Sequence, residues 1–121
     1  MSSDDFDIVA YRVLRYIDAC TKGGVSPTVA QARELSKVGN SYLASVLESL
    51  SDGGYITGVD VNSYYDGTTD ISFRNAHITM EGAGYLRDNS LMAKARKTLG
   101  SAFETVIEVA VSKLMSVTAI L

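Results

Sequence analysis

Several residue types that build reactive sites are scarce in this sequence. Cys20 is the only cysteine and His77 the only histidine, which excludes an intrachain disulfide and metal sites made of several histidines, such as HExxH. The glycine-rich stretch GGYITG at residues 53–58 lacks the Lys-Ser/Thr that completes a phosphate-binding loop. The acidic residues show no pairing that favours a carboxylate metal site or a glycosidase site. We therefore expect no metal, no cofactor and no enzymatic activity.

Positive charge and long apolar runs are also scarce. The 11 Lys and Arg residues are outnumbered by 14 Asp and Glu residues, and the net charge of −3 counts against a protein held to nucleic acid mainly by charge. Glu108 and Lys113 interrupt the apolar C-terminal region, so no stretch reaches the roughly 18–20 residues of a membrane span. The N-terminus MSSDDFD lacks the basic and apolar regions of a signal peptide. We expect a soluble cytoplasmic protein without a membrane partner.

What the sequence does contain is 46% hydrophobic residues, enough for the core of one compact domain. Apolar positions recur every three or four residues up to Gly23-Gly24, which predicts a first helix with the face Phe6, Val9, Val13, Leu14, Ile17 and Cys20. Ser26 as N-cap and Pro27 at the first helical position predict a second helix. A third helix, capped by Asn40 or Ser41, would end at Asp52-Gly53-Gly54 and bury Leu43, Val46, Leu47 and Leu50.

After the third helix the apolar spacing changes to the alternation of half-buried strands. The first strand alternates at Val59, Val61, Ser63 and Tyr65. Asp66-Gly67 then predicts a two-residue hairpin turn. On the return, the apolar residues change from odd to even numbers between Phe73 and Ala76, so we expect a bulge near Arg74-Asn75.

The stretch HITMEGAGYL, residues 77–86, places Gly82 and Gly84 in the first turn of a further helix that Thr79 caps. A glycine there costs about 1 kcal/mol of helix propensity relative to alanine. We therefore predict that Gly82 allows close approach to a neighbouring backbone. Ser90 is expected to cap the last helix. There the apolar steps average about 3.6 residues, which predicts one stripe on one long helix: Met92, Ala95, Leu99, Phe103, Val106, Ala110, Leu114, Val117 and Leu121.

Three helices, a β-hairpin and further helices in this order predict an α+β fold of the winged helix-turn-helix type. The hairpin from Ile56 to Ile78 would be the wing. Residues 1–89 would form the winged helix-turn-helix domain, and residues 90–121 a long amphipathic C-terminal helix. Another small α+β domain with the same element order is the alternative.

Three stretches carry a family pattern: GGYITGV at the entry to the wing, ITMEGAGYLRDNS at its exit, and AKARKTLGSAFETV after it. The matching positions are Gly54, Tyr55, Ile56, Ile78, Thr79, Gly82, Tyr85, Leu86, Lys94 and Lys97. From about Arg12 to Val109 the chain resembles the YjcQ-like family, small winged-helix proteins found in bacterial genomes and prophages. The resemblance implies the fold and a phage or prophage setting, and implies no established biochemical activity.

In a winged helix, the third helix usually enters the major groove of DNA. The positions that would face the groove include none of the Arg, Lys, Asn or Gln residues that make bidentate contacts to bases: Ser41, Tyr42, Ala44, Ser45, Glu48 and Ser49. Residues 41–70 contain five acidic residues and no basic one, whereas residues 71–99 contain five basic and two acidic residues, or +3. A DNA-binding surface would therefore draw on Lys37, Asn40, Ser41, Tyr42, Ser45, Arg74, Lys94, Arg96 and Lys97.

Residues 90–121 would extend about 48 Å as one helix, since each residue adds roughly 1.5 Å. A small winged-helix core is shorter than that. The helix therefore either bends near Gly100 and packs on its own domain, or projects and pairs with a second copy. The second arrangement predicts a homodimer through Phe103, Val106, Ala110, Leu114 and Val117.

Two functions are compatible with these observations. The first is a phage or prophage winged-helix regulator that binds DNA. The second is a winged-helix module adapted to protein–protein interaction, which the acidic third helix and wing favour. A measurement of DNA binding at low salt separates the two.

Overall fold

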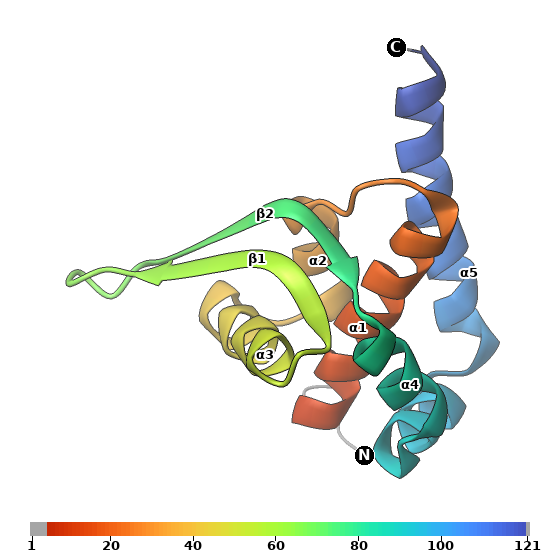
Figure 1. The fold of residues 1–121 in the computed structure, drawn as a ribbon, viewed down its shortest axis with the longest axis horizontal. Coiled ribbons are helices and arrows are strands. Elements are labelled where there is room, and N and C mark those ends of the chain that lie inside the picture. Colours follow the sequence, from red (N-terminus) through yellow and green to blue (C-terminus); the bar gives the residue numbers. More distant parts are fainter. Residues whose placement is uncertain (1–4, 121) are drawn as a thin grey trace.

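The computed structural model describes residues 5–120, with side chains described up to Ser116. Its elements in chain order are α1 (Phe6–Gly23), α2 (Val29–Ser36), α3 (Asn40–Asp52), β1 (Ile56–Ser63), β2 (Thr69–Ile78), α4 (Met80–Asp88) and α5 (Ser90–Ile120). The two strands form an antiparallel hairpin. This is a winged-helix-like α+β fold, as the sequence predicts (Figure 1).

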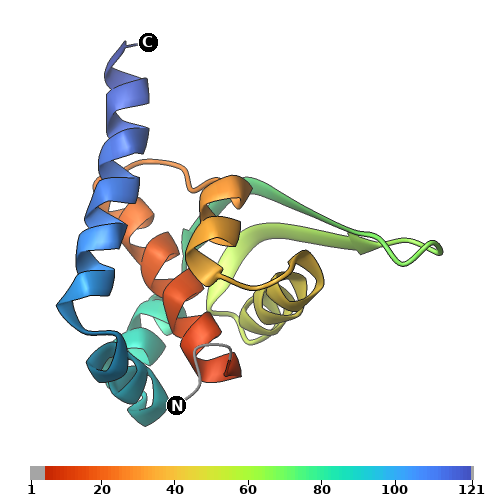
Figure 2. The same cartoon turned by 180° about the vertical axis from the view of Figure 1, so that it is seen from behind.

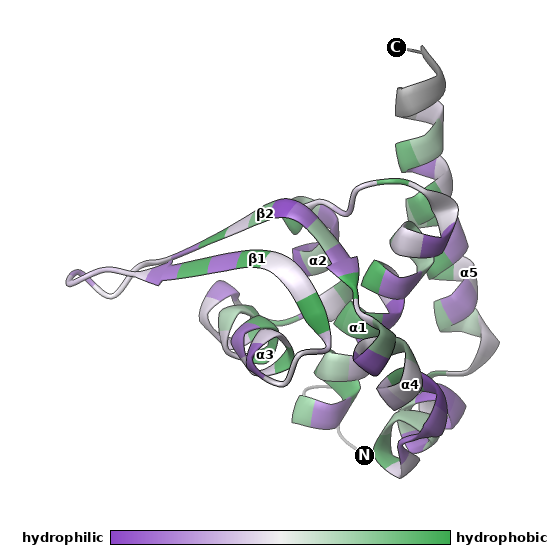
Figure 3. Cartoon of the chain, in the orientation of Figure 1, coloured by the Kyte–Doolittle hydropathy of each residue, from purple (hydrophilic) through white to green (hydrophobic). Residues whose placement is uncertain are grey.

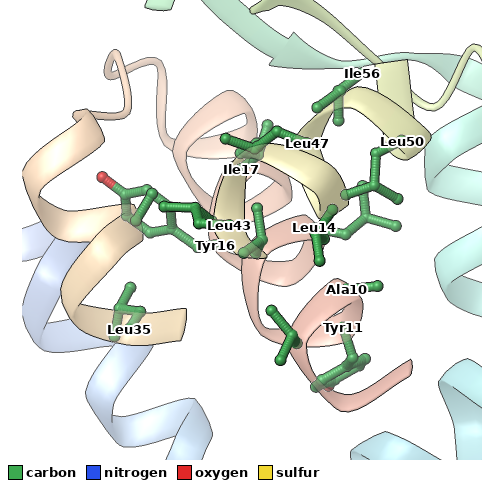
Figure 4. Packing of buried hydrophobic residues seen from close by; sticks show 14 of the residues in the cluster. Ala10, Tyr11, Leu14, Tyr16, Ile17, Leu35, Leu43, Leu47, Leu50 and Ile56 are labelled. Carbon is green, nitrogen blue, oxygen red and sulfur yellow. The ribbon is translucent and has the colours of Figure 1, made fainter. Parts of the chain in front are cut away.

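Helix α1 lies at the centre, with α3 and the hairpin on one side and α5 on the other (Figures 1 and 2). Its predicted apolar face is buried from Val9 to Cys20, whereas Phe6 is 44% exposed. Other faces of α1 are buried as well, as expected of a helix enclosed by its neighbours. The close-up of the core shows side chains from α1, α3 and β1 packed together, among them Leu14, Ile17, Leu43, Leu47 and Ile56 (Figure 4).

The N-caps of α2 and α3 differ from the prediction. The α2 cap is Thr28 rather than Ser26, because the Thr28 hydroxyl accepts a hydrogen bond from an amide of the first helical turn at 3.1 Å. The α3 cap is Gly39, so Asn40 is the first helical residue and Ser41 the second. Each loop contains more than one residue able to cap a helix, and the packing of the helices selects among them.

The hairpin has the predicted bulge. Thr57 pairs with His77 and Val59 with Phe73, so a single residue of β1 lies opposite three residues of β2. Asn75, in the middle of the three, has a φ of +55°. Beyond the bulge, hydrophobic and hydrophilic residues alternate along both strands (Figure 3). This alternation agrees with a hairpin that packs one face on the rest of the domain and exposes the other.

The turn at the tip of the hairpin is longer than predicted. The Tyr64 amide donates to the Thr68 carbonyl at 2.9 Å, which encloses three residues rather than Asp66-Gly67 alone. Three-residue hairpin loops commonly end in a glycine, as this one does at Gly67. The Asp66 carboxylate closes the loop by accepting from the Thr68 amide at 3.0 Å and its hydroxyl at 2.6 Å. Tyr64 and Tyr65 are both exposed.

The base of the hairpin is a tight joint, and Gly82 is the residue that permits it. A Cβ at Gly82 would overlap the backbone carbonyl of Tyr55, which confirms the predicted close approach. Thr79 connects the two sides of the joint: its amide donates to Tyr55 O at 3.0 Å, and its hydroxyl accepts from the Gly82 amide at 3.0 Å. Gly84 has no comparable neighbour. Its Cβ position is in ordinary contact only with the guanidinium of Arg87, 3.7 Å away.

Helix α5 is broken at Gly100, where φ is 67° and ψ is −165°. The prediction of one stripe on one long helix therefore fails at Gly100, and of the two predicted arrangements the structure shows the bend. The part before the break follows α4 closely, and the part after it runs along α1 and extends beyond it (Figures 1 and 2). Asn89, rather than Ser90, caps α5 through Oδ1, which accepts from two first-turn amides at 2.9 and 3.2 Å.

Candidate interaction surface

Helix α3 and the hairpin lie side by side, and we call residues 40–78 the α3–hairpin region (Figure 1). The apolar face of α3 is buried as predicted. Its exposed residues are Ser41, Ser45, Glu48, Ser49 and Asp52. Ala44, expected to face a DNA groove, is buried. Tyr42 is half-buried, and its ring stacks on Phe6 with centroids 6.1 Å apart.

Asn40 forms hydrogen bonds that connect three elements of the fold. Its amide nitrogen donates to the Thr69 carbonyl at 2.7 Å, and its amide oxygen accepts from Nε and Nη2 of Arg33 at 3.2 and 3.0 Å. One side chain thereby connects α2, α3 and β2. Asn40, one of the predicted DNA-binding residues, therefore already has partners on both sides of its amide.

The charge of the α3–hairpin region is strongly negative. Its five acidic residues, Glu48, Asp52, Asp60, Asp66 and Asp70, are all exposed. Its single basic residue, Arg74, lies with its Nε 3.3 Å from Asp60 Oδ2. Both side chains of that pair are largely exposed, so the pair adds little stability. Hydrogen bonds from Thr68 lower the pKa of the Asp66 carboxyl, which keeps the tip charged.

The other predicted cations lie elsewhere. Lys37, at the end of α2, is exposed and has a φ of +59°. Lys94, Arg96 and Lys97 belong to the first part of α5, which lies on the opposite side of α1 from the hairpin (Figures 1 and 2). Arg96 donates to the Leu86 carbonyl at 2.8 Å. The structure thus does not bring the predicted DNA-binding residues together on one surface.

The predicted dimer residues are divided between the core and the surface. Phe103 and Ala110 are buried within the same chain, because α5 packs on α1. Leu114 is half-buried and Val106 is 46% exposed. The side chain of Val117 lies outside the described residues. Among the predicted interface residues whose side chains the structure describes, Val106 is the most exposed.

Buried Arg12 is a candidate site residue that the sequence analysis does not predict. Arg12 of α1 is 8% exposed and lines a cavity between α2 and α5. Its position supplied a signal, since it lies three residues after Val9 and next to Val13 on the apolar face of α1. A charged residue on such a face is rarely buried without a partner.

The buried titratable groups of α1 favour packing rather than reactivity. Burial raises the pKa of the Cys20 thiol to about 11 and that of the Tyr16 hydroxyl to about 12. The Tyr16 hydroxyl donates to Gln31 Oε1 at 2.6 Å and accepts from the Thr28 amide at 3.0 Å. Within residues 5–120, no three His, Cys, Asp or Glu side chains gather as ligands for a metal ion.

The arrangement defines a class: a winged-helix-like α+β protein whose third helix and wing are acidic. None of the helices in the described chain has the length and apolar character that a membrane span needs. The family model described as YjcQ protein matches residues 11–104. The chain therefore belongs to the YjcQ family. No curated protein and no solved structure matches the chain.

Proposed function

We propose that the protein is a non-enzymatic winged-helix module of phage or prophage type that acts by binding a protein through its α3–hairpin region. The charge of this region carries the proposal, because five carboxylates are exposed and its single cation, Arg74, is paired with Asp60. A basic segment of a partner would be attracted to such a surface, whereas the DNA backbone would be repelled. Exposed Tyr64 and Tyr65 add aromatic rings of the kind that protein interfaces favour.

Site-specific photo-crosslinking in cells tests this proposal. A photoreactive phenylalanine analogue at Ser45 or Tyr65 should crosslink the same protein. The analogue at Ser90, an exposed residue at the start of α5, is the control and should not. The charge reversal Glu48→Lys should reduce the crosslink from Ser45, because it weakens the attraction for a basic partner. Equal crosslinking from all three positions would contradict the proposal.

DNA binding is the second candidate function. It is favoured by three of the four exposed lysines for which the described part of the chain shows no ion pair, Lys37, Lys94 and Lys97, the fourth being Lys113. Such cations, together with Arg74 and Arg96, could neutralise phosphates. Binding would then depend on the cations rather than on direct readout by α3.

Fluorescence anisotropy with random and genomic duplexes at low and moderate salt tests the second candidate. Absence of binding at low salt contradicts it. Binding that is unchanged when Lys94, Arg96 and Lys97 are all replaced by alanine would show that this surface is not the one used. Binding that falls steeply with salt and is lost in the triple variant would instead favour DNA over a protein partner.

A further inference from the structure

A groove between α2 and the second part of α5 lies outside the α3–hairpin region. It consists of two neighbouring cavities of about 270 and 200 Å³ that share Glu34, Leu35 and Val106. Most of the surface that lines both is apolar, with Phe103 in the first and Val109 in the second. Val106 and Val109 are 46% and 50% exposed, so apolar surface is left open to water along the groove.

Two cations line the first cavity, and the buried one, Arg12, has no ion-pair partner in the described structure. Arg12 is 8% exposed, and within the described residues no carboxylate lies within ion-pair distance of it. Its Nη1 makes one long hydrogen bond, 3.5 Å, to the Leu35 carbonyl, and its Nε has no hydrogen-bond partner. The guanidinium lies 5.3 Å from the centroid of the Phe103 ring. Lys37 is the second cation of this cavity.

Arg15, one turn further along α1, has the carboxylate partners that Arg12 lacks. Its Nη2 lies 2.9 Å from Glu104 Oε2 and its Nη1 3.2 Å from Asp18 Oδ2. A guanidinium removed from water normally needs such partners, because its desolvation is costly. Burial lowers the pKa of Arg12, yet an arginine keeps its charge at any physiological pH. The burial of Arg12 without an ion-pair partner, and the unpartnered Nε, therefore favour an anionic group in the cavity.

We propose that this groove binds an aliphatic monocarboxylate. The carboxylate accepts a hydrogen bond from the Arg12 guanidinium, whose planar donors suit a two-oxygen acceptor. Lys37 adds a second positive charge at the same end. The hydrocarbon chain lies along Leu35, Val106 and Val109.

The dimensions and charges of the groove favour this class of ligand. At about 1.5 Å per residue, Ala102 and Val109 lie about 10 Å apart along α5, which suits a hydrocarbon chain of medium length. Besides Arg12 and Lys37, the charged residues that line the groove are Glu34, at the junction of the two cavities, and Lys113, in the second cavity. Glu34 disfavours a doubly charged phosphate group near Arg12. A monocarboxylate matches the single buried cation and gains from burial of its chain.

Isothermal titration calorimetry of the full chain with decanoate, below its micellar concentration, tests the proposal. Decanol, inorganic phosphate and acetate are the comparison probes. We expect decanoate to bind at least about tenfold more tightly than each of them, because only decanoate offers both the charge and the chain. Arg12→Met should weaken decanoate about tenfold or more. Arg74→Met, which removes a cation outside the groove, should leave the affinity unchanged.

Two further variants keep the test decisive if Arg12→Met folds poorly. Val106→Gln changes an exposed wall residue and should weaken decanoate several-fold without affecting the Arg12 contacts. Lys37→Gly removes the second cation at a position whose positive φ suits glycine, and should weaken decanoate about two- to fivefold. Glu34→Gln should leave the affinity unchanged or raise it, because it removes a negative charge from the groove.

Several outcomes overturn the proposal. One is binding of decanol as tight as that of decanoate, and another is decanoate binding that is unchanged in Arg12→Met. A tenfold loss of affinity in Arg74→Met, or no decanoate binding by the wild-type chain, also overturns it. Light scattering of the ligand-free chain should give the monomer mass of about 13 kDa. If the wild-type chain instead gave twice that mass and Val106→Gln gave the monomer mass, a second copy of the chain would fill the groove and the proposal would be wrong.

Discussion

Two arginines of this chain carry the same guanidinium in opposite settings. In the α3–hairpin region, the Arg74 side chain is 82% exposed and lies beside Asp60. In the groove between α2 and α5, Arg12 is 8% exposed and has no carboxylate beside it in the described structure. Water solvates the first charge and makes its pairing nearly irrelevant. The second charge depends on what else enters the cavity, so burial rather than charge count decides which residue needs a ligand.

The two regions are also attached to the domain differently. The groove lies between helices that pack on α1, whereas the hairpin projects and is fastened at its base (Figure 1). At that base, the Tyr55 and Tyr85 rings stack with centroids 4.3 Å apart, beside the Gly82 joint. The projecting end of the hairpin therefore depends on a few close contacts at its base, whereas α3 and the helices beside the groove pack on α1.

Gly82→Ala should destabilise the protein most, because the new Cβ would overlap the Tyr55 carbonyl. We expect a loss of about 3 kcal/mol or more in the free energy of unfolding, measured by urea denaturation. Gly84→Ala is the matched control in the same helix. Since its Cβ has space, it should be neutral or gain up to about 1 kcal/mol. Equal losses in both variants would mean that helix propensity, rather than the joint, explains the glycines.

Alkaline pH should destabilise the core around the end of α1, where Cys20 is buried. Folding raises the pKa of Cys20 from 9.0 to about 11, so the native state keeps a proton that the unfolded chain has lost. The contribution of Cys20 to stability is complete below pH 9 and falls as the pH rises toward 11. A shift of two units corresponds to a loss on the order of 3 kcal/mol. Urea denaturation under reducing conditions from pH 8 to 11 measures it.

Cys20→Ala is the control for the pH series. The variant loses stability at every pH because it shortens a buried side chain, but its decline between pH 9 and 11 should be shallower than that of the wild type. Parallel curves for the two proteins would show that Cys20 does not carry the effect. Tyr16 should add a further decline between pH 10 and 12 in both proteins, since its pKa is raised to about 12.

The sequence predicts those features whose signal is local. The parity change between Phe73 and Ala76 predicts the bulge, and the cost of glycine in a helix predicts the close approach at Gly82. The break at Gly100 was only one of two alternatives, because the apolar period of 3.6 continues through it. The unpaired state of Arg12 could not be predicted, since it depends on Leu35 and Phe103, which the fold brings to it from distant parts of the chain.

Replacing each of the two arginines by methionine should give the smallest changes in stability and the clearest comparison. Arg12→Met removes an unpaired buried charge and keeps most of its volume, so the ligand-free protein should gain about 1 kcal/mol in the free energy of unfolding. Arg74→Met should change it by less than about 0.5 kcal/mol, because the lost pair is exposed. Urea denaturation at low and moderate salt measures both. A gain in stability on removal of Arg12 is expected if the buried charge serves ligand binding at the expense of stability. A loss of stability in Arg12→Met would mean that Arg12 is instead a structural residue of the core.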